Sequence, residues 1–183
     1  SMDIVLVLDR SGSMRYVMAD MKPVAIALVD QLDLTNSRAA VVSFSSSVRI
    51  DVGLTDSHTQ IHSAINGLTA GGLTNIVGAL QSASDVLTSS ARQDVHKVIW
   101  LLSDGVQNSQ YGGDRTAITQ ALTLQRNDVR IFSVGFGGVS HATIRSMASN
   151  PESDHALIGS NVQDIEQRFS DLCTMVYSPS PPP

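Results

Sequence analysis

The sequence of 183 residues contains a single cysteine, Cys173, which excludes an internal disulfide bond. Two interpretations of this residue stay open. It is either a small buried hydrophobic side chain on the last helix, or its partner preceded residue 3 and the pair joined the ends of the chain in an oxidising compartment. Because the opening Ser1-Met2 is not typical of a natural start, we expect this sequence to be one domain of a longer protein.

Long hydrophobic runs and clusters of basic residues are both missing. The longest apolar runs, such as residues 4–8 and 98–102, are far shorter than the ~20 residues that cross a bilayer, so we expect no membrane insertion. The 12 Lys and Arg residues are outnumbered by 17 Asp and Glu residues, for a formal net charge of −5. This balance is not typical of nucleic-acid-binding proteins, and we expect no nucleic acid partner.

The composition is that of a soluble globular protein with a packed core, because 42% of the residues are hydrophobic and 16% are charged. The length fits one domain, which we place at residues 3–177. Residues 178–183, Ser-Pro-Ser-Pro-Pro-Pro, have a different composition and predict an extended, semi-rigid linker.

Apolar segments that predict strands alternate with segments that predict helices. Most of the strand segments are continuous runs of Val, Ile and Leu, which is typical of strands covered on both faces of a parallel sheet. We therefore expect a three-layer α/β/α fold, Rossmann-like, with a mostly parallel six-stranded sheet. The predicted strands are residues 3–8, 39–44, 48–52, 96–102, 129–134 and 156–158.

The third predicted strand follows the second too closely for a helix to lie between them. It should return antiparallel at the edge of the sheet, with Ser45-Ser46-Ser47 as the turn. An apolar stripe over residues 14–32 predicts the first helix, and Pro23 should kink it. Further helices are expected at residues 59–66, 76–88, 115–126, 141–149 and 162–176.

Three loops of unusual polar content follow predicted strands or helices. The stretch VLVLDRSGSM ends a buried strand in Asp9 and then offers Ser11 and Ser13, with Gly12 expected to allow a tight turn between them. A second loop contains Thr74, and a third contains Asp104. Since ligands of open parallel sheets bind beyond the carboxyl ends of the strands, we expect these side chains to form one site.

Two carboxylates and three hydroxyls, without His or Cys, form an all-oxygen set that suits a hard cation. We expect Mg²⁺, with Mn²⁺ or Ca²⁺ as alternatives, held by Asp9, Ser11, Ser13, Thr74 and Asp104. These ligands fall short of a closed coordination shell, so a carboxylate from an Asp or Glu of a protein partner could complete it. The competing interpretation of Asp9, Ser11 and Ser13 is helix capping, and that of Asp104-Gly105 is a simple turn.

The same residues resemble the metal-ion-dependent adhesion site of von Willebrand factor type A domains. The Asp-x-Ser-x-Ser motif of that family stands at Asp9, Ser11 and Ser13. Its loop threonine stands at Thr74 within Gly-Gly-Leu-Thr-Asn, and its second acid at Asp104 within Leu-Leu-Ser-Asp-Gly. Arg10 departs from the pattern, because small residues are common there; its charge could pair with an acidic ligand or lower the affinity for a cation.

The resemblance implies a sheet of five parallel strands and one antiparallel strand, with Mg²⁺ at its top. It implies that Ser11, Ser13 and Thr74 contact the ion, while Asp9 and Asp104 act mostly through waters and orient the hydroxyls. It also implies ligand specificity in the loops around Ser45, residues 71–72 and residues 107–114. In integrin-type relatives the last helix, here residues 162–176, moves when affinity changes.

The implied function is that of an adhesion module rather than an enzyme, in a cell-surface or extracellular protein. The Ser/Pro tail favours a stalk or matrix protein, whereas the absence of Asn-x-Ser/Thr acceptors is mild evidence against glycosylation. Two alternatives stay open. One is an intracellular assembly module of a multi-subunit complex, and the other is a metal-dependent phosphohydrolase, for which no nucleophile or base can be assigned.

Three other motifs are weaker indications of function. His58 and His62 share one helix face but lack the Glu and the third ligand of a zinc protease, so we expect a solvated face. Residues 135–138, Gly-Phe-Gly-Gly, lack the remaining residues of a phosphate-binding loop. Ser11-Gly12-Ser13 is not a hydrolase nucleophile elbow.

Overall fold

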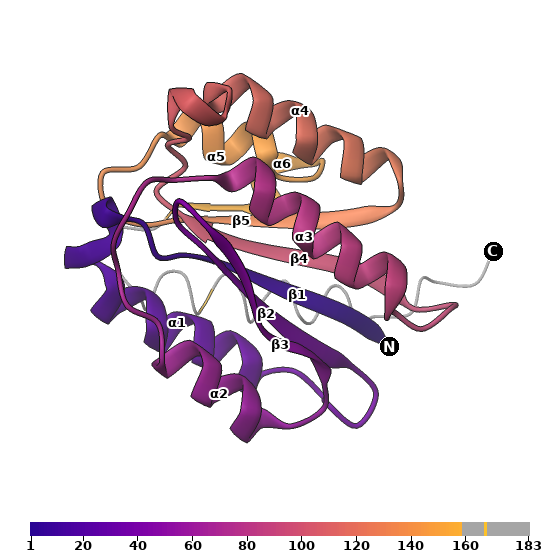
Figure 1. Cartoon of the computed structure of the whole chain (residues 1–183). Helices are drawn as coiled ribbons and strands as arrows, with labels where there is room; N and C mark the ends of the chain where they lie inside the picture. Colours follow the sequence, from indigo (N-terminus) through magenta and orange to yellow (C-terminus); the bar gives the residue numbers. More distant parts are fainter. Residues whose placement is uncertain (159–166, 168–183) are drawn as a thin grey trace.

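A computed structural model describes residues 1–158 and residue 167 of the chain (Figure 1). The expected domain end at residue 177, Cys173, the tail at residues 178–183 and all but Gln167 of the expected last helix lie outside the described residues. Over the described part of the chain, no helix is long and apolar enough to cross a membrane.

A six-stranded sheet forms the centre of the molecule, with the strand order β3-β2-β1-β4-β5-β6. All neighbouring strands run parallel except β2 and β3, which pair antiparallel at one edge, so the predicted sheet is confirmed. The strands are β1 (Met2–Asp9), β2 (Arg38–Phe44), β3 (Val48–Thr55), β4 (His96–Ser103), β5 (Val129–Gly135) and β6 (Ala156–Ile158).

Helices cover both faces of the sheet and give the three layers (Figure 1). One face packs against α1 and α2, and the opposite face packs against α3, α4 and α5. The helices are α1 (Met18–Asp30), α2 (His58–Asn66), α3 (Ile76–Ser89), α4 (Gly113–Arg126), α5 (His141–Met147) and α6 (Glu152–His155), with short 3-10 helices at Gly12–Tyr16 and Ser109–Tyr111.

The strand β1 shows why the continuous apolar runs predict this fold. Successive side chains of a strand point to opposite faces. Leu6 and Leu8 accordingly pack in the α1 and α2 layer, whereas Val5 and Val7 pack in the α3 and α4 layer. All eight residues of β1 are buried, so both faces of the strand are covered and its sequence does not alternate between apolar and polar residues.

The edge hairpin is confirmed as well. Ser45 N donates to Ser47 O at 2.9 Å in the turn between β2 and β3. The pairing of β2 with β3 is interrupted by register shifts between Ala39 and Val42, and β3 is only partly buried. Bulges of this kind twist an edge strand away from pairing with another chain.

The predicted helix boundaries needed correction. Met14 lies in the 3-10 helix Gly12–Tyr16, and α1 begins only at Met18, because the site loop occupies the intervening residues. Pro23 is accommodated inside α1. The helix α5 ends at Met147, two residues before the expected end, and α6 was not predicted.

The chain order places a switch point between β1 and β4. From β1 the chain moves to β2 on one side, and it later returns to β4 on the other side, so the loops after β1 and β4 diverge at their carboxyl ends. Crevices at such switch points are where open α/β sheets bind ligands. The loops that carry Asp9 and Asp104 leave the sheet at this position.

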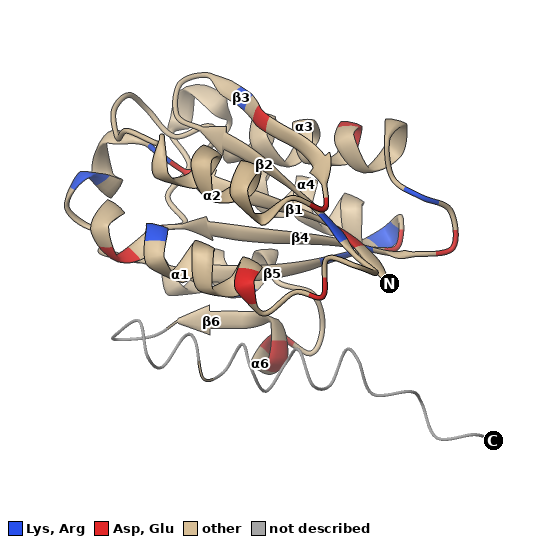
Figure 2. Cartoon of the chain, turned by 90° about the horizontal axis from the view of Figure 1, so that it is seen from below, with Lys and Arg blue, Asp and Glu red and all other residues tan. Residues whose placement is uncertain are grey.

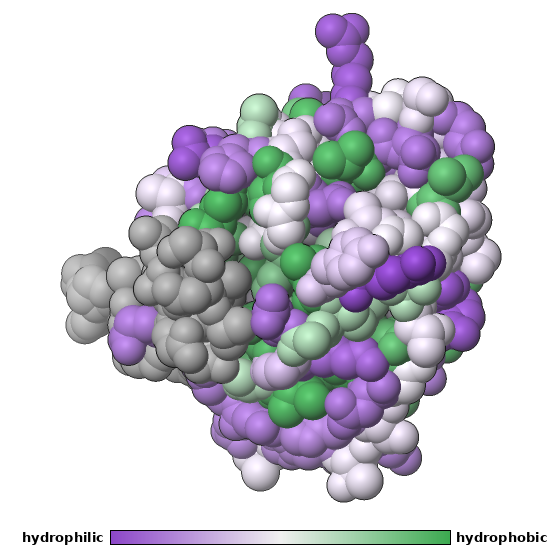
Figure 3. Space-filling model, turned by 90° about the vertical axis from the view of Figure 1, so that its left-hand side faces the viewer, coloured by the Kyte–Doolittle hydropathy of each residue, from purple (hydrophilic) through white to green (hydrophobic). Residues whose placement is uncertain are grey.

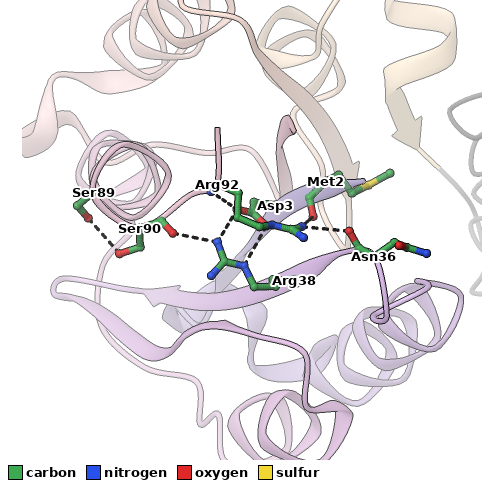
Figure 4. Close-up of polar contacts among 7 residues, drawn as sticks. All are labelled: Met2, Asp3, Asn36, Arg38, Ser89, Ser90 and Arg92. Atoms are coloured by element: carbon green, nitrogen blue, oxygen red, sulfur yellow. Dashed lines mark hydrogen bonds and ion pairs between the residues drawn. The ribbon is translucent and has the colours of Figure 1, made fainter. Parts of the chain in front are cut away.

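At the opposite end of β1, a buried carboxylate joins three segments (Figure 4). Asp3 is fully buried; Arg38 Nη2 donates to its Oδ2 at 2.7 Å, and Arg92 Nη2 donates to its Oδ1 at 2.9 Å. Arg92 N also donates to Asp3 Oδ2 at 2.7 Å. Elsewhere, Figure 2 shows acidic and basic residues interspersed over the described elements.

Asp3→Asn should lower the free energy of unfolding by about 2 kcal/mol at neutral pH. This is less than for a fully buried ion pair because both guanidinium groups are partly exposed. Burial, the largest influence, raises the pKa of Asp3, but the hydrogen bonds from Arg38 and Arg92 outweigh it and leave the pKa below 3.8.

The contribution of Asp3 should therefore be complete above the unfolded-state pKa near 3.8 and should be lost as the pH falls through the lower folded-state value. Urea denaturation of the wild type and the variant from pH 2 to 7 measures this, with exposed Asp20→Asn as the control. A difference between wild type and Asp3→Asn that stays constant down to pH 2 would contradict the assignment.

Candidate metal centre

Backbone hydrogen bonds bring the three predicted loops together. Gly12 N donates to Gly72 O at 2.9 Å, and Gly71 N donates to Arg10 O at 2.8 Å, which joins the first loop to the second. Asn108 N donates to Thr74 O at 3.2 Å and joins the second loop to the segment after Asp104. The loops thus meet at the carboxyl ends of β1 and β4, as expected.

Asp9 is fully buried at the end of β1, and both of its carboxylate oxygens accept hydrogen bonds. Ser11 N donates to Oδ1 at 2.8 Å, and Ser103 Oγ donates to Oδ2 at 2.6 Å. The Ser103 hydroxyl in turn accepts from Gly105 N at 3.0 Å. Asp9 therefore fixes the backbone of both the first and the third loop.

The hydroxyls of Ser11 and Ser13 lie 3.0 Å apart, with Ser11 buried and Ser13 exposed. Ser11 precedes the 3-10 helix Gly12–Tyr16, but its side chain makes no capping hydrogen bond. The capping interpretation therefore does not account for Ser11, and the two hydroxyls are available for another role.

Thr74 and Asp104 complete the predicted set. Both are 5% exposed, and both line a pocket of about 540 Å³ that Ser13 also lines. Asp104 Oδ1 accepts from Val106 N at 3.0 Å, and Thr74 N donates to Asn108 Oδ1 at 2.6 Å. The structure thus places three of the five predicted residues on the pocket wall. Asp9 and Ser11 do not line the pocket, but Ser11 contacts both Asp9 and Ser13.

The electrostatics of this arrangement favour a cation. Burial raises the pKa of Asp9 to about 6; the hydrogen bonds from Ser103 and Ser11 oppose the rise, and the charge of Asp104 adds to it. A buried carboxylate next to a second acid is costly without a compensating charge. A cation at this position would remove that cost.

The donor set also fits a particular kind of ion. Among residues 1–158 and 167, no three His, Cys, Asp or Glu side chains gather into a metal-binding group. A metal here would therefore depend on the hydroxyls of Ser11, Ser13 and Thr74 as well as on the two carboxylates. Such a set of oxygen atoms suits a hard divalent cation rather than a site built on His and Cys.

The sequence profile of the von Willebrand factor type A domain matches residues 3–171. The chain belongs to this family. Its curated relatives include the mouse "Sushi, von Willebrand factor type A, EGF and pentraxin domain-containing protein 1", 31% identical over 91% of this chain, and human matrilin-3, 25% identical over 93%. The chain spans 5% and 37% of the lengths of these two proteins.

Several solved structures have the same fold. The manganese-loaded TRAP protein of Plasmodium vivax has a TM-score of 0.76 at 20% identity, covering 94% of this chain and 73% of that one. Proximal thread matrix protein 1 of the mussel byssus, in a structure described as having a zinc-occupied MIDAS motif, has a TM-score of 0.75 at 25% identity. This match covers 96% of this chain and 45% of the mussel chain.

Within this type A domain, three supporting residues were not predicted. Ser103 orients Asp9, Asn108 holds Thr74, and buried Gln107 accepts from Ile76 N at 2.6 Å through Oε1 at the start of α3. Ser103 precedes Asp104 in the recognised motif, which was a usable signal. Gln107 and Asn108 were expected in a specificity loop, yet Gln107 points into the protein and is structural.

Two residues of the first loop contact neighbouring loops. At Gly12, where a tight turn was expected, a Cβ atom would lie 3.2 Å from Gly72 O, so the first and second loops approach closely at this position. The Arg10 guanidinium turns toward the β2–β3 turn, where Nε donates to Ser43 Oγ at 3.2 Å and Nη2 donates to Ser47 Oγ at 3.2 Å. These contacts fasten the turn beside the site.

Of the two remaining motifs, the histidine pair is not among the residues that line this pocket, whereas the glycine-rich segment is. His62 is partly buried and its Nε2 lies 2.8 Å from Asp30 Oδ1, and the rings of His58 and His62 are in edge contact, so the expectation of a simply solvated face was wrong. Phe136, Gly137 and Gly138 line the same pocket as Thr74 and Asp104. These three residues therefore lie on the wall of the pocket that Thr74 and Asp104 also line.

Asn108→Ala should lower the free energy of unfolding by about 1–2 kcal/mol, because the Thr74 N–H in the buried loop would lose its acceptor. Chemical denaturation compared with Asn127→Ala, which removes a hydrogen bond from an exposed helix end, measures the effect. Equal effects of the two substitutions would show that Asn108 does not hold the loop.

Proposed function

We propose that this domain, placed at residues 3–177 and followed by a linker at residues 178–183, is a cation-dependent protein-binding module. Its ion, Mg²⁺ with Mn²⁺ or Ca²⁺ as alternatives, would accept a carboxylate from an Asp or Glu of a protein ligand. The observation that carries the proposal is the combination of buried carboxylates and hydroxyls at one pocket at the switch point of the sheet.

Each residue has a distinct part in this proposal. The hydroxyls of Ser11, Ser13 and Thr74 would hold the ion, and Asp9 and Asp104 would orient them and balance its charge. Asp9 is suited to this part because its two oxygens already bind the first and third loops. When bound, the ion supplies a Lewis-acidic centre for an incoming carboxylate.

Two similar structures support a divalent ion, since the TRAP protein is manganese-loaded and the mussel protein has zinc in its MIDAS motif. The similarity to matrilin-3 and to a thread matrix protein of the mussel byssus supports a location outside the cell or at its surface rather than the intracellular assembly module. The same similarity supports a binding rather than a catalytic role.

Calorimetric titration of Mg²⁺ and Mn²⁺ into chelator-stripped protein should give saturable binding at one site. Asp9→Ala and Thr74→Ala should each weaken it by at least about 10-fold, in the range found for loss of residues that support a metal. The matched surface variants Asp20→Ala and Thr88→Ala should bind as the wild type does. Undiminished binding by Thr74→Ala with its fold intact would refute the assigned site.

The ion should also stabilise the fold. At a free concentration 100 times its Kd, a ligand that binds only the folded state adds about 2.7 kcal/mol. The midpoint of thermal unfolding should therefore rise with Mn²⁺ for the wild type and for Asp20→Ala. For Asp9→Ala the rise at the same Mn²⁺ concentration should be clearly smaller because the ion binds more weakly, and an equal rise in that variant would place the stabilising ion elsewhere.

A further inference from the structure

The mouth of the metal pocket is apolar on two sides. Leu73 and Val106 both line it, from different loops, and their side chains are 39% and 46% exposed. Figure 3, which views the side toward which the parallel strands run, shows apolar surface gathered near the middle of this face. The large exposed hydrophobic side chains of the described residues are Tyr16, Ile50, Leu73, Val106 and Leu122.

The exposure of Leu73 and Val106 follows from how the site is built. Leu73 N donates to Ser46 Oγ at 2.9 Å, and Val106 N donates to Asp104 Oδ1 at 3.0 Å. Leu73 also directly precedes Thr74. Ser46 and Asp104 thus hold the two backbones in positions where both side chains are exposed at the pocket. Their apolar surface stays in water unless a bound partner covers it.

Three glycines contribute stretches of the wall that have no side chain. Gly72, Gly137 and Gly138 line the pocket, and a Cβ atom at Gly138 would meet no atom within 4 Å. The pocket volume of about 540 Å³ lies within the range of about 300–1,000 Å³ typical of ligand pockets. This is room for a carboxylate together with the residues beside it.

We propose that the ligand of this pocket is a protein segment in which an Asp or Glu is flanked by apolar side chains. The carboxylate would meet the ion, while its apolar neighbours cover Leu73 and Val106. The inference rests on the proposed function and adds to it the sequence class of the ligand. The acids of the site repel a carboxylate in the absence of the ion, so this ligand binds only in its presence.

Three disulfide-cyclised peptides test the ligand class, with Leu-Glu-Leu, Ser-Glu-Ser or Leu-Gln-Leu at the centre of one common loop. In saturating Mn²⁺, Leu-Glu-Leu should bind about 10-fold or more tightly than Ser-Glu-Ser, as expected for burial of an additional apolar side chain. Leu-Gln-Leu should show no cation-dependent binding. Equal affinity for the two acidic peptides would overturn the inference.

Protein variants test the surface. Leu73→Ser and Val106→Thr should lose the preference for Leu-Glu-Leu while taking up Mn²⁺ like the wild type. The matched controls are Leu122→Ser, where the side chain is 40% exposed, and Ile50→Thr, where it is 54% exposed; both lie outside the pocket lining and should keep the preference. Gly138→Leu should block the peptide, whereas Gly53→Leu on β3, which also has open space at its Cβ position, should not.

The outcomes separate the inference from the function on which it rests. If Mn²⁺ binds and both acidic peptides bind equally, the proposed function stands and the apolar preference is wrong. If Mn²⁺ binds but neither acidic peptide does, both the proposed function and the apolar preference are wrong. Sedimentation that shows the wild type dimerising and Leu73→Ser monomeric would mean that a second copy of the chain covers the apolar rim, which also overturns the inference.

Discussion

The fold depends at its functional end on one buried carboxylate. Asp9 ends a strand in which every residue is buried, at the point where the strand order of the sheet changes direction. One of its oxygens accepts from the backbone of Ser11, and the other accepts from Ser103 at the end of the neighbouring strand. Two loops that leave the sheet in different directions are thereby held to one group. Burial raises the pKa of Asp9 although these hydrogen bonds oppose the rise, so the buried position of the carboxylate favours a positive charge beside it.

The supporting hydrogen bonds explain how this end of the sheet keeps its shape. Asn108 bonds to Thr74 through both its side chain and its backbone, and Gln107 links the start of α3 to the loop after β4. The residues of the proposed metal site therefore lie on an ordered framework. Ser46 and Asp104 hold the backbones of Leu73 and Val106 where the two side chains are exposed beside this proposed site.

The sequence predicted the strands well because each buried strand must be apolar on both faces, which leaves a continuous run. It also predicted which three loops meet at the end of the sheet, since Asp9, Thr74 and Asp104 stand in recognisable motifs. It could not predict the bond between Gln107 and Ile76, because the two residues are 31 positions apart and neither has a distinctive local pattern. The start of α1 was predicted too early because Met14 lies in a separate 3-10 helix, Gly12–Tyr16, which the apolar pattern does not distinguish from α1.

Anomalous diffraction from crystals of the Mn²⁺-loaded domain tests the central claim most directly, because it locates the ion independently of any assumption about its ligands. The account predicts one dominant peak among the side chains of Ser11, Ser13 and Thr74, with Asp9 and Asp104 next to it. A peak at any other position, such as beside His62 and Asp30, with none at the carboxyl ends of β1 and β4, would contradict the account.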